Sequence, residues 1–131
     1  MIIDSSALLT VVLREPERER YLNAMLNANP RRMSVANWFE SSMVVDSRGN
    51  PTASSRFEEV VRLLQLELEP VSGAQAELAR RAWQLFGKGN HRARLNYGDC
   101  FAYALAKETG EPLLFKGDDF SQTDIDSALK D

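Results

Sequence analysis

The chain opens with the stretch Met1-Ile2-Ile3-Asp4-Ser5-Ser6-Ala7-Leu8, which sets the pattern that the rest of the sequence repeats. Its apolar start predicts a short buried strand over residues 1–4, and Ser5 or Ser6 can cap the helix that follows. An aspartate that ends a strand and precedes a helix lies at the edge where parallel sheets place their ligands. This stretch therefore predicts an α/β fold with a carboxylate at its functional edge.

The same strand-then-helix alternation continues along the 131 residues. Further strands are predicted over residues 31–35, 66–71 and 112–115, with a possible short last strand near Ile125. Helices are predicted over residues 5–12, 16–26, 36–48, 52–65, 72–86 and 96–107. This order predicts one domain spanning residues 1–131, with a mostly parallel sheet of four to five strands covered by helices on both faces.

The composition is that of a globular protein, with 44% apolar and 27% charged residues. Cys100 is the single cysteine, so the sequence predicts no internal disulfide, no cysteine-rich zinc site and a reducing, cytoplasmic location. No apolar run approaches the roughly 18 to 20 residues that span a bilayer, and residues 1–4 do not resemble a secretory signal. We therefore expect no membrane partner.

Positive charge is concentrated in one segment of this chain, whose net charge is −3. Residues 78–98 contain no acid and carry five cations, so the remaining residues carry a net charge of −8. The basic residues that directly precede Asp99 are Lys88, His91, Arg92 and Arg94. They are candidates for contacts with RNA phosphates, although a solvated loop that balances acids elsewhere explains them about as well.

Acidic residues occupy matching places in the predicted fold. Asp4 ends the first strand, Asp99 begins the helix after the basic segment, and Asp118 and Asp119 follow the fourth strand. Glu40 lies inside a helix, with apolar residues at 36, 43 and 44 as its neighbours at helical spacing, so we expect it to face inward. A buried carboxylate needs a partner or a metal.

Carboxylates that converge repel one another unless a cation offsets their charge. Hard divalent cations bind oxygen ligands, and Mg²⁺ uses few carboxylates and keeps water and substrate phosphate oxygens in its shell. Two such ions about 3.5 to 4 Å apart can stabilise the attacking and leaving oxygens of phosphodiester hydrolysis. Several acids without a histidine partner thus favour Mg²⁺ over zinc.

Each acid also has a purely structural interpretation. Asp4 can cap the first helix, and Asp99 can form a capping box with Asn96 three residues earlier. Asp118 and Asp119 follow a glycine, as is common in turns. Glu40 can pair with a buried arginine. Taken singly these interpretations are favoured for every acid except Glu40, whose inward position is the hardest to explain, and the joint pattern points to a metal site.

Three segments together resemble PIN domains, specifically their VapC-type toxin branch. They are Ile2-Ile3-Asp4-Ser5-Ser6-Ala7-Leu8, Leu95-Asn96-Tyr97-Gly98-Asp99-Cys100-Phe101-Ala102-Tyr103 and Leu113-Leu114-Phe115-Lys116-Gly117-Asp118-Asp119-Phe120. Glu40 falls where the family has a helical glutamate. The resemblance spans the chain and implies a three-layer α/β/α PIN-like fold. It also implies an endoribonuclease that depends on Mg²⁺ or Mn²⁺ and acts as a bacterial toxin.

The resemblance also assigns roles to residues. Asp4 and Asp99 would be the main metal ligands, Glu40 would complete the cluster, and Ser6 would hydrogen-bond within it. Many PIN domains place the fourth acid two residues after a threonine that ends the strand. Here Phe115 and Gly117 occupy those two positions, so we predict Asp119 as the fourth acid and retain Asp118 as the alternative.

The hypothesis for the mechanism is that Asp4 and Asp99 hold one Mg²⁺, with Glu40 and Asp119 near it, and that a metal-activated water attacks an RNA phosphorus in line. Tyr97 and Trp38 are candidates for stacking on bases, although packing is the simpler role for Trp38. The resemblance further implies a VapB-like antitoxin as partner, bound at the first two helices and the residue 57–64 helix, and a homodimer.

Other classes fit less well. A PIN-like module that binds RNA or protein but is catalytically impaired remains open, because of the missing acid at Gly117. A haloacid-dehalogenase-like phosphatase needs a second aspartate where Ser6 stands. A flavodoxin-like receiver domain needs a lysine after a late strand, which Lys116 partly satisfies, but the helical insert after the first strand does not fit. Cys100 as a nucleophile has only His91 as an imidazole partner, so a small buried role is expected.

Overall fold

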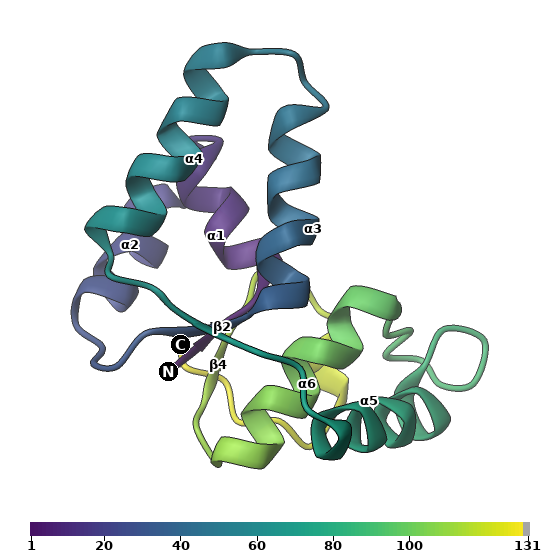
Figure 1. The fold of residues 1–131 in the computed structure, drawn as a ribbon. Coiled ribbons are helices and arrows are strands. Elements are labelled where there is room, and N and C mark those ends of the chain that lie inside the picture. The colour runs from purple at the N-terminus through teal and green to yellow at the C-terminus, as the bar shows by residue number, and fades with distance from the viewer. Residues whose placement is uncertain (130–131) are drawn as a thin grey trace.

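The computed structural model describes residues 1–129, in which four short strands lie between two groups of helices (Figure 1). The strands are β1 (Ile2–Ile3), β2 (Arg32–Ser34), β3 (Glu67–Glu69) and β4 (Leu113–Leu114). The helices are α1 (Ser5–Val12), α2 (Arg18–Leu26), α3 (Val35–Asp46), α4 (Pro51–Leu63), α5 (Gly73–Phe86) and α6 (Tyr97–Thr109), with a short 3₁₀ turn η1 (Phe120–Gln122). The predicted alternation of strands and helices is confirmed.

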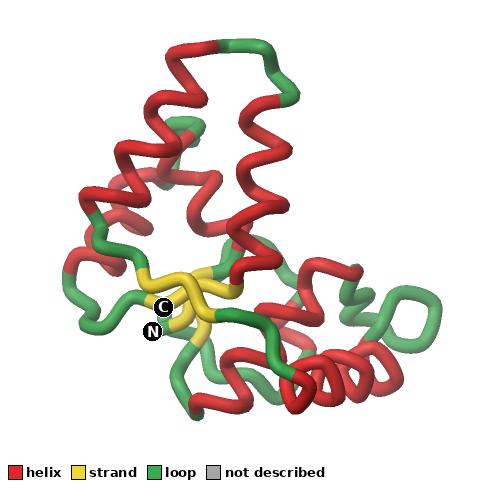
Figure 2. Tube along the Cα trace, viewed as in Figure 1, coloured by secondary structure: helices red, strands yellow, loops and turns green. Residues whose placement is uncertain are grey.

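The sheet is parallel throughout and has the strand order β3-β2-β1-β4. Successive side chains of a strand point to opposite faces. Ile2 and its register partner Leu113 accordingly pack into one core with α5 and α6, whereas Ile3 and Leu114 pack into a second core with α1 to α4. Figure 2 shows the strands at the centre with helices on either side. The three-layer α/β/α prediction is confirmed.

Side-chain caps explain where most helices begin. The residue just before each of five helices accepts a hydrogen bond from a backbone N–H of the first turn; these residues are Asp4, Ser34, Asn50, Ser72 and Asn96. Such caps satisfy N–H groups that have no partner within the helix. At the other end of α6, Gly110 has φ +71°, the left-handed conformation that glycine adopts readily.

Some predicted boundaries were wrong. No strand forms near Ile125 in the described residues; only an isolated bridge joins Leu113 to Ser127. The second helix begins at Arg18 rather than at Pro16, because residues 14–17 form a turn. None of the helices within residues 1–129 combines the length and apolarity needed to cross a membrane.

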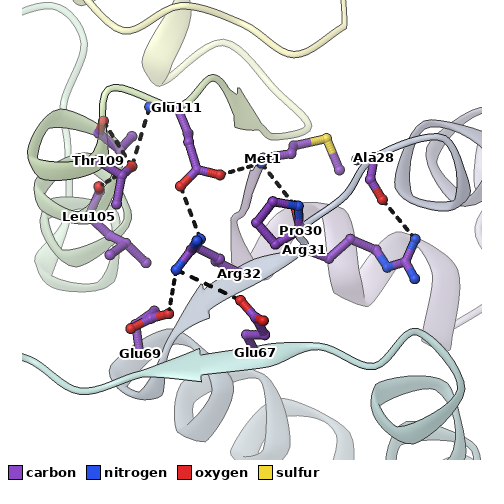
Figure 3. A network of polar contacts seen from close by, with 11 residues as sticks. Met1, Ala28, Pro30, Arg31, Arg32, Glu67, Glu69, Leu105, Thr109 and Glu111 are labelled. Atoms are coloured by element: carbon purple, nitrogen blue, oxygen red, sulfur yellow. Dashed lines mark hydrogen bonds and ion pairs between the residues drawn. The ribbon is translucent and has the colours of Figure 1, made fainter.

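Arg32, the first residue of β2, lies among acidic side chains whose charge it offsets together with the terminal amine of Met1 (Figure 3). The Arg32 guanidinium lies 3.0 Å from Glu69, 3.1 Å from Glu111 and 3.7 Å from Glu67. Glu111 also accepts a hydrogen bond of 2.6 Å from the terminal amine of Met1. These acids therefore have counter-charges supplied by the protein. The opposite edge of the sheet, where β1 and β4 end, is different.

Candidate active site

Asp4 follows β1 and is held in place by Ser6. The Ser6 backbone N–H and hydroxyl both donate to Asp4 Oδ2, at 3.0 and 2.6 Å. The Ser6 hydroxyl oxygen in turn accepts a hydrogen bond of 2.9 Å from the Lys116 backbone N–H just beyond β4. Ser6 thus fixes the Asp4 carboxylate and joins the ends of two neighbouring strands. Asp4 does cap α1, as its structural interpretation states, but the cap uses one of its two oxygens.

Asp99 also caps a helix. Its Oδ2 accepts from the Asn96 backbone N–H at 3.0 Å, while the Asp99 N–H donates to Asn96 Oδ1 at 2.9 Å, which completes the predicted capping box. Asp4 and Asp99 are only 4% and 9% exposed. Helix capping and membership of a buried acidic cluster are therefore compatible, and both aspartates combine them.

Electrostatic interactions link four acids of the site in pairs. Burial, aided by repulsion from Glu40 and opposed by the Ser6 hydrogen bonds, raises the pKa of Asp4 to about 6. Burial also raises the pKa of Asp99 to about 8, and repulsion from Asp4, a hydrogen bond shared with Asp119 and repulsion from Asp119 add to this effect. These carboxyl groups retain protons at a pH where isolated aspartates have none.

Glu40 reaches the cluster from α3. Its Oε1 accepts a hydrogen bond of 2.6 Å from the Ser5 hydroxyl and a longer one of 3.5 Å from the Asn37 amide. Glu40 was predicted to share an inward face with Met43 and Val44, and this prediction was wrong, because both apolar residues are exposed. The buried face of α3 is formed by Asn37, Ser41 and Val45. Glu40 lies at the margin of that face, half-buried, and its partner is Ser5 rather than a buried arginine.

The two candidate fourth acids, Asp118 and Asp119, differ in their relation to Asp99. Asp119 directly precedes η1 and interacts with Asp99. Both Asp118 and Asp119 are exposed, and Asp119 alone of the two is among the causes of the raised pKa of Asp99. Gly117, which replaces the acid expected there, has φ +102°, a conformation that favours glycine over any acidic residue. The chain thus brings Asp119 into the cluster by a turn that Gly117 makes possible.

In residues 1–129, none of the four acids forms an ion pair with a lysine, arginine or histidine. The Lys116 side chain, adjacent in space, instead pairs with Glu15 at 2.8 Å. Within the same residues, no three acidic, histidine or cysteine side chains are already close enough together to form a complete metal-binding group. The donors of the cluster are all oxygens, as hard divalent cations prefer.

The predicted RNA-binding residues lie in the loop between α5 and α6. Lys88, Arg92 and Arg94 are exposed beside the start of α6. His91 is different: its Nδ1 accepts a hydrogen bond of 2.9 Å from the Ala93 N–H, and its ring packs edge-on against Phe86 with centroids 5.2 Å apart. His91 therefore shapes the loop, whereas the three cations face solvent.

Cys100, next to Asp99, is buried among apolar residues on the other side of α6. Burial, with a contribution from Asp99, raises the pKa of its thiol to about 11. A neutral thiol is a poor nucleophile. The expected small, buried role of Cys100 is confirmed.

Three further residues shape the site and were not predicted. Ser5 and Asn37 hold Glu40, and the Asn37 amide also donates to the Gly98 carbonyl at 2.9 Å, which links α3 to α6. Gly98 leaves room for Glu40, since a Cβ there would collide with its carboxylate. Asn37 precedes Glu40 by three residues, a helical spacing that marks it as a neighbour.

The comparisons with known proteins agree with this geometry. Residues 1–126 match the PIN domain family. The chain is 42% identical over 130 residues to the ribonuclease VapC28 of Mycobacterium tuberculosis, covering 98% of each protein, and 43% identical over 125 residues to VapC30 of the same species, covering 95% of each. The chain belongs to the VapC branch of the PIN-domain family.

Two solved structures have a similar fold. VapC20 of M. tuberculosis, described as a toxin that cleaves the sarcin-ricin loop, superposes with a TM-score of 0.73 and covers 95% of each chain at 15% identity. A toxin–antitoxin complex from Klebsiella pneumoniae gives a TM-score of 0.72 at 16% identity, covering 94% of this chain and 92% of the other. The match of residues 1–126 to the PIN domain family excludes the haloacid-dehalogenase-like and receiver-domain alternatives.

Proposed function

We propose that the protein is a metal-dependent endoribonuclease and the toxin of a toxin–antitoxin pair. The observation that carries this proposal is a series of interacting acids at the carboxyl edge of the sheet, in which Asp4 interacts with Glu40 and Asp99, and Asp99 with Asp119. None of the four forms an ion pair with a cation among residues 1–129. Glu111, which precedes β4, is by contrast paired with both Arg32 and the terminal amine of Met1. The names of the 42–43% identical relatives support the same activity.

The cluster suits a hard divalent cation. Its donors are carboxylate oxygens, and the raised pKa values of Asp4 and Asp99 indicate a site where negative charge lacks compensation. Mg²⁺ is commonly held by one or two carboxylates with water in the remaining positions. Asp4 and Asp99 are therefore sufficient direct ligands for Mg²⁺ or Mn²⁺, and Glu40 and Asp119 flank them.

The protein's own residues then position the reaction. When bound, the cation supplies an acidified water and offsets charge on the phosphate. Ser6 orients Asp4, and the capping box with Asn96 orients Asp99, so both carboxylates are pre-arranged. Exposed Lys88, Arg92 and Arg94 lie where they can contact the phosphates of RNA. Hydrolysis breaks one P–O bond and needs no side-chain nucleophile, which agrees with the neutral thiol of Cys100.

Cleavage assays on a panel of structured and unstructured RNAs test the activity. The protein is expected to cut within RNA chains in Mg²⁺ or Mn²⁺ and to stop when EDTA is added. A protein that binds RNA in both conditions without cutting it in either metal would instead be the catalytically impaired module.

An antitoxin fits the side of the molecule formed by α2 and α4. Leu26 and Leu63 are 57% and 63% exposed there. The Arg31 guanidinium bridges the same region by donating to the Met25 and Leu64 carbonyls at 3.0 and 2.6 Å. Co-expression of a small neighbouring gene should relieve toxicity. Leu26→Asp/Leu63→Asp protein should remain toxic beside it while cutting RNA normally, and relief equal to that of the parent would place the antitoxin elsewhere.

A homodimer is the second assembly that we propose. Phe39 and Met43 are one turn apart on α3 and are 57% and 51% exposed. Apolar side chains in such a row are suited to a symmetric contact between two copies of α3. Light scattering should give the mass of two chains for the parent and of one for Phe39→Asp/Met43→Asp protein. A parent of single-chain mass at micromolar concentration would contradict this assembly.

A further inference from the structure

A large pocket lies between α5 and α6, away from the acidic cluster. It has a volume of about 550 Å³ and is lined by apolar and aromatic side chains, including Trp83 from α5 and Tyr97 and Phe101 from α6. This volume lies within the range of pockets that bind small organic groups. In Figure 1, α5 and α6 lie side by side on the face of the sheet opposite to α1.

The aromatic rings of this pocket are exposed to an unusual degree. Tyr97 is 79% exposed and Trp83 is 43% exposed. The Tyr97 ring packs in a T-shaped pair with Phe101, with centroids 4.9 Å apart and planes at 77°. One face of the Tyr97 ring is therefore available for stacking in a defined orientation. Exposed aromatic faces of this kind bind unpaired nucleobases in many single-strand-binding proteins.

The charges of the pocket favour an anionic ligand. Among its lining residues, the two charged ones, Arg80 and Lys88, are both cations, and they belong to the acid-free segment of residues 78–98. A purely apolar docking site for a protein segment would not require them. Aromatic rings with cations at the rim match a ligand that is flat and apolar in one part and carries phosphate in another.

The pocket is also connected to the acidic cluster. Asn96 lines the pocket and forms the reciprocal hydrogen bonds with Asp99. Asp99 and Cys100 are consecutive on α6, so they face directions about 100° apart, toward the cluster and toward the pocket respectively. An RNA strand that crosses the start of α6 can therefore place a phosphate at the acidic cluster and a base in the pocket.

We infer that the α5–α6 pocket binds an unpaired base of the RNA strand whose phosphodiester lies at the acidic cluster. Tyr97 and Trp83 stack on the base, and Arg80 and Lys88 contact adjoining phosphates. The pocket thus fixes the position of the strand relative to the cut and favours unpaired over paired RNA. This inference rests on the proposed ribonuclease function.

Fluorescence of Trp83 tests the pocket without any cleavage. Trp38 is first replaced by Phe, a mild change because it packs beside Phe57, so that Trp83 is the sole tryptophan. The protein is titrated in EDTA with a random-sequence RNA of twelve nucleotides, and with a twelve-unit tetrahydrofuran-phosphate oligomer that has the phosphates but no bases. RNA should quench Trp83, and the base-free oligomer should not.

Variants separate the two kinds of contact. Tyr97→Ala should weaken RNA binding about tenfold, as expected for one lost stacking contact, while Tyr97→Phe keeps the ring and the affinity. Binding of the base-free oligomer should not change in Tyr97→Ala protein. Arg80→Gln/Lys88→Gln should weaken binding of both oligomers, whereas Arg62→Gln, an exposed cation on α4, should weaken neither.

Several results would overturn the inference. One is equal quenching of Trp83 by the base-free oligomer, and another is unchanged RNA affinity in Tyr97→Ala protein. A third is a mass of Tyr97→Ala protein in light scattering that differs from the mass of the parent, which would assign the pocket to a second copy of the chain. Failure of the proposed function looks different: RNA would quench the fluorescence of Trp83 in EDTA, yet the protein would leave RNA uncut in Mn²⁺.

Discussion

The Glu40 carboxylate lies against the Cα atom of Gly98, in the space that a side chain at position 98 would occupy. Glu40 comes from α3 and Gly98 from the first turn of α6, so this contact brings two carboxylate-bearing helices together. The Asn37 amide reinforces it with its 2.9 Å hydrogen bond to the Gly98 carbonyl. Gly98 is therefore required for close approach, and not for an unusual backbone conformation.

Gly98→Ala should displace Glu40 and reduce RNA cleavage at least tenfold. The added methyl group overpacks a tight contact, which typically costs about 1–3 kcal/mol of stability. Gly73→Ala is the matched control, because a Cβ at Gly73, in the first turn of α5, meets no atom within 4 Å. The control should retain full activity and gain stability. Equal activities of the two variants would show that the Glu40–Gly98 contact has no role in cleavage.

Ser6→Ala should lower both stability and activity. The hydroxyl donates to Asp4 and accepts from the Lys116 N–H, so its loss leaves a buried carboxylate oxygen and an N–H with fewer partners. The expected cost is about 1–3 kcal/mol, measured by urea unfolding. Ser6→Thr keeps the hydroxyl and should preserve more activity than Ser6→Ala. Wild-type cleavage by Ser6→Ala protein would mean that Asp4 needs no orienting partner.

Asp119→Asn and Asp118→Asn form a matched pair of neighbouring substitutions. Both side chains are exposed, but Asp119 interacts with Asp99, whereas Asp118 accepts from Ser121 with its backbone carbonyl. Cleavage rates should fall at least tenfold for Asp119→Asn and less than twofold for Asp118→Asn. The reverse order would make Asp118 the fourth acid.

The pH dependence of unfolding in EDTA tests the buried acids. The folded-state pKa values of about 6 for Asp4 and about 8 for Asp99 exceed the usual value of 3.8. The folded protein therefore binds more protons than the unfolded chain between about pH 4 and pH 8. Stability from these groups is fully present below pH 4 and is lost as the pH rises to about 8.

Thermal unfolding between pH 5 and pH 8 measures this effect. The melting temperature of the parent should fall with rising pH, and Asp99→Asn protein should show a flatter profile. The side-chain oxygen of an asparagine at this position can still accept from the Asn96 N–H, so this variant removes the charge while keeping the capping box. Mn²⁺ should raise the melting temperature of the parent most at pH 8. Parallel profiles for parent and variant would contradict the raised pKa of Asp99.

The comparison of sequence with structure shows which features local patterns determine. The strand-then-helix order and the caps at Asp4, Ser72 and Asn96 follow from neighbouring residues, so they were predictable. Glu40 was predicted as a residue of the acidic site for a wrong reason, because helical spacing does not show which face of a helix is buried. The face containing Met43 is exposed, and the buried face is partly polar.

Contacts between distant segments could not be predicted from the sequence. Ser5 is 35 residues from Glu40 and Asn37 is 61 residues from Gly98, so only the assembled fold shows that they meet. The choice between Asp118 and Asp119 depended on the left-handed turn at Gly117. The pocket between α5 and α6 likewise arises from helix packing, although its cations were visible as an acid-free segment.

The central claim is that the acidic cluster is a cation site that cleaves RNA. It is tested most directly by single-turnover cleavage of one RNA substrate at saturating Mn²⁺ by the parent, Asp4→Asn and Asp99→Asn proteins. Both variants keep a capping side chain and are expected to remain folded. We predict that each cuts at least 100-fold more slowly than the parent, and that EDTA abolishes cleavage by the parent. Folded variants that cut RNA as fast as the parent would contradict the claim.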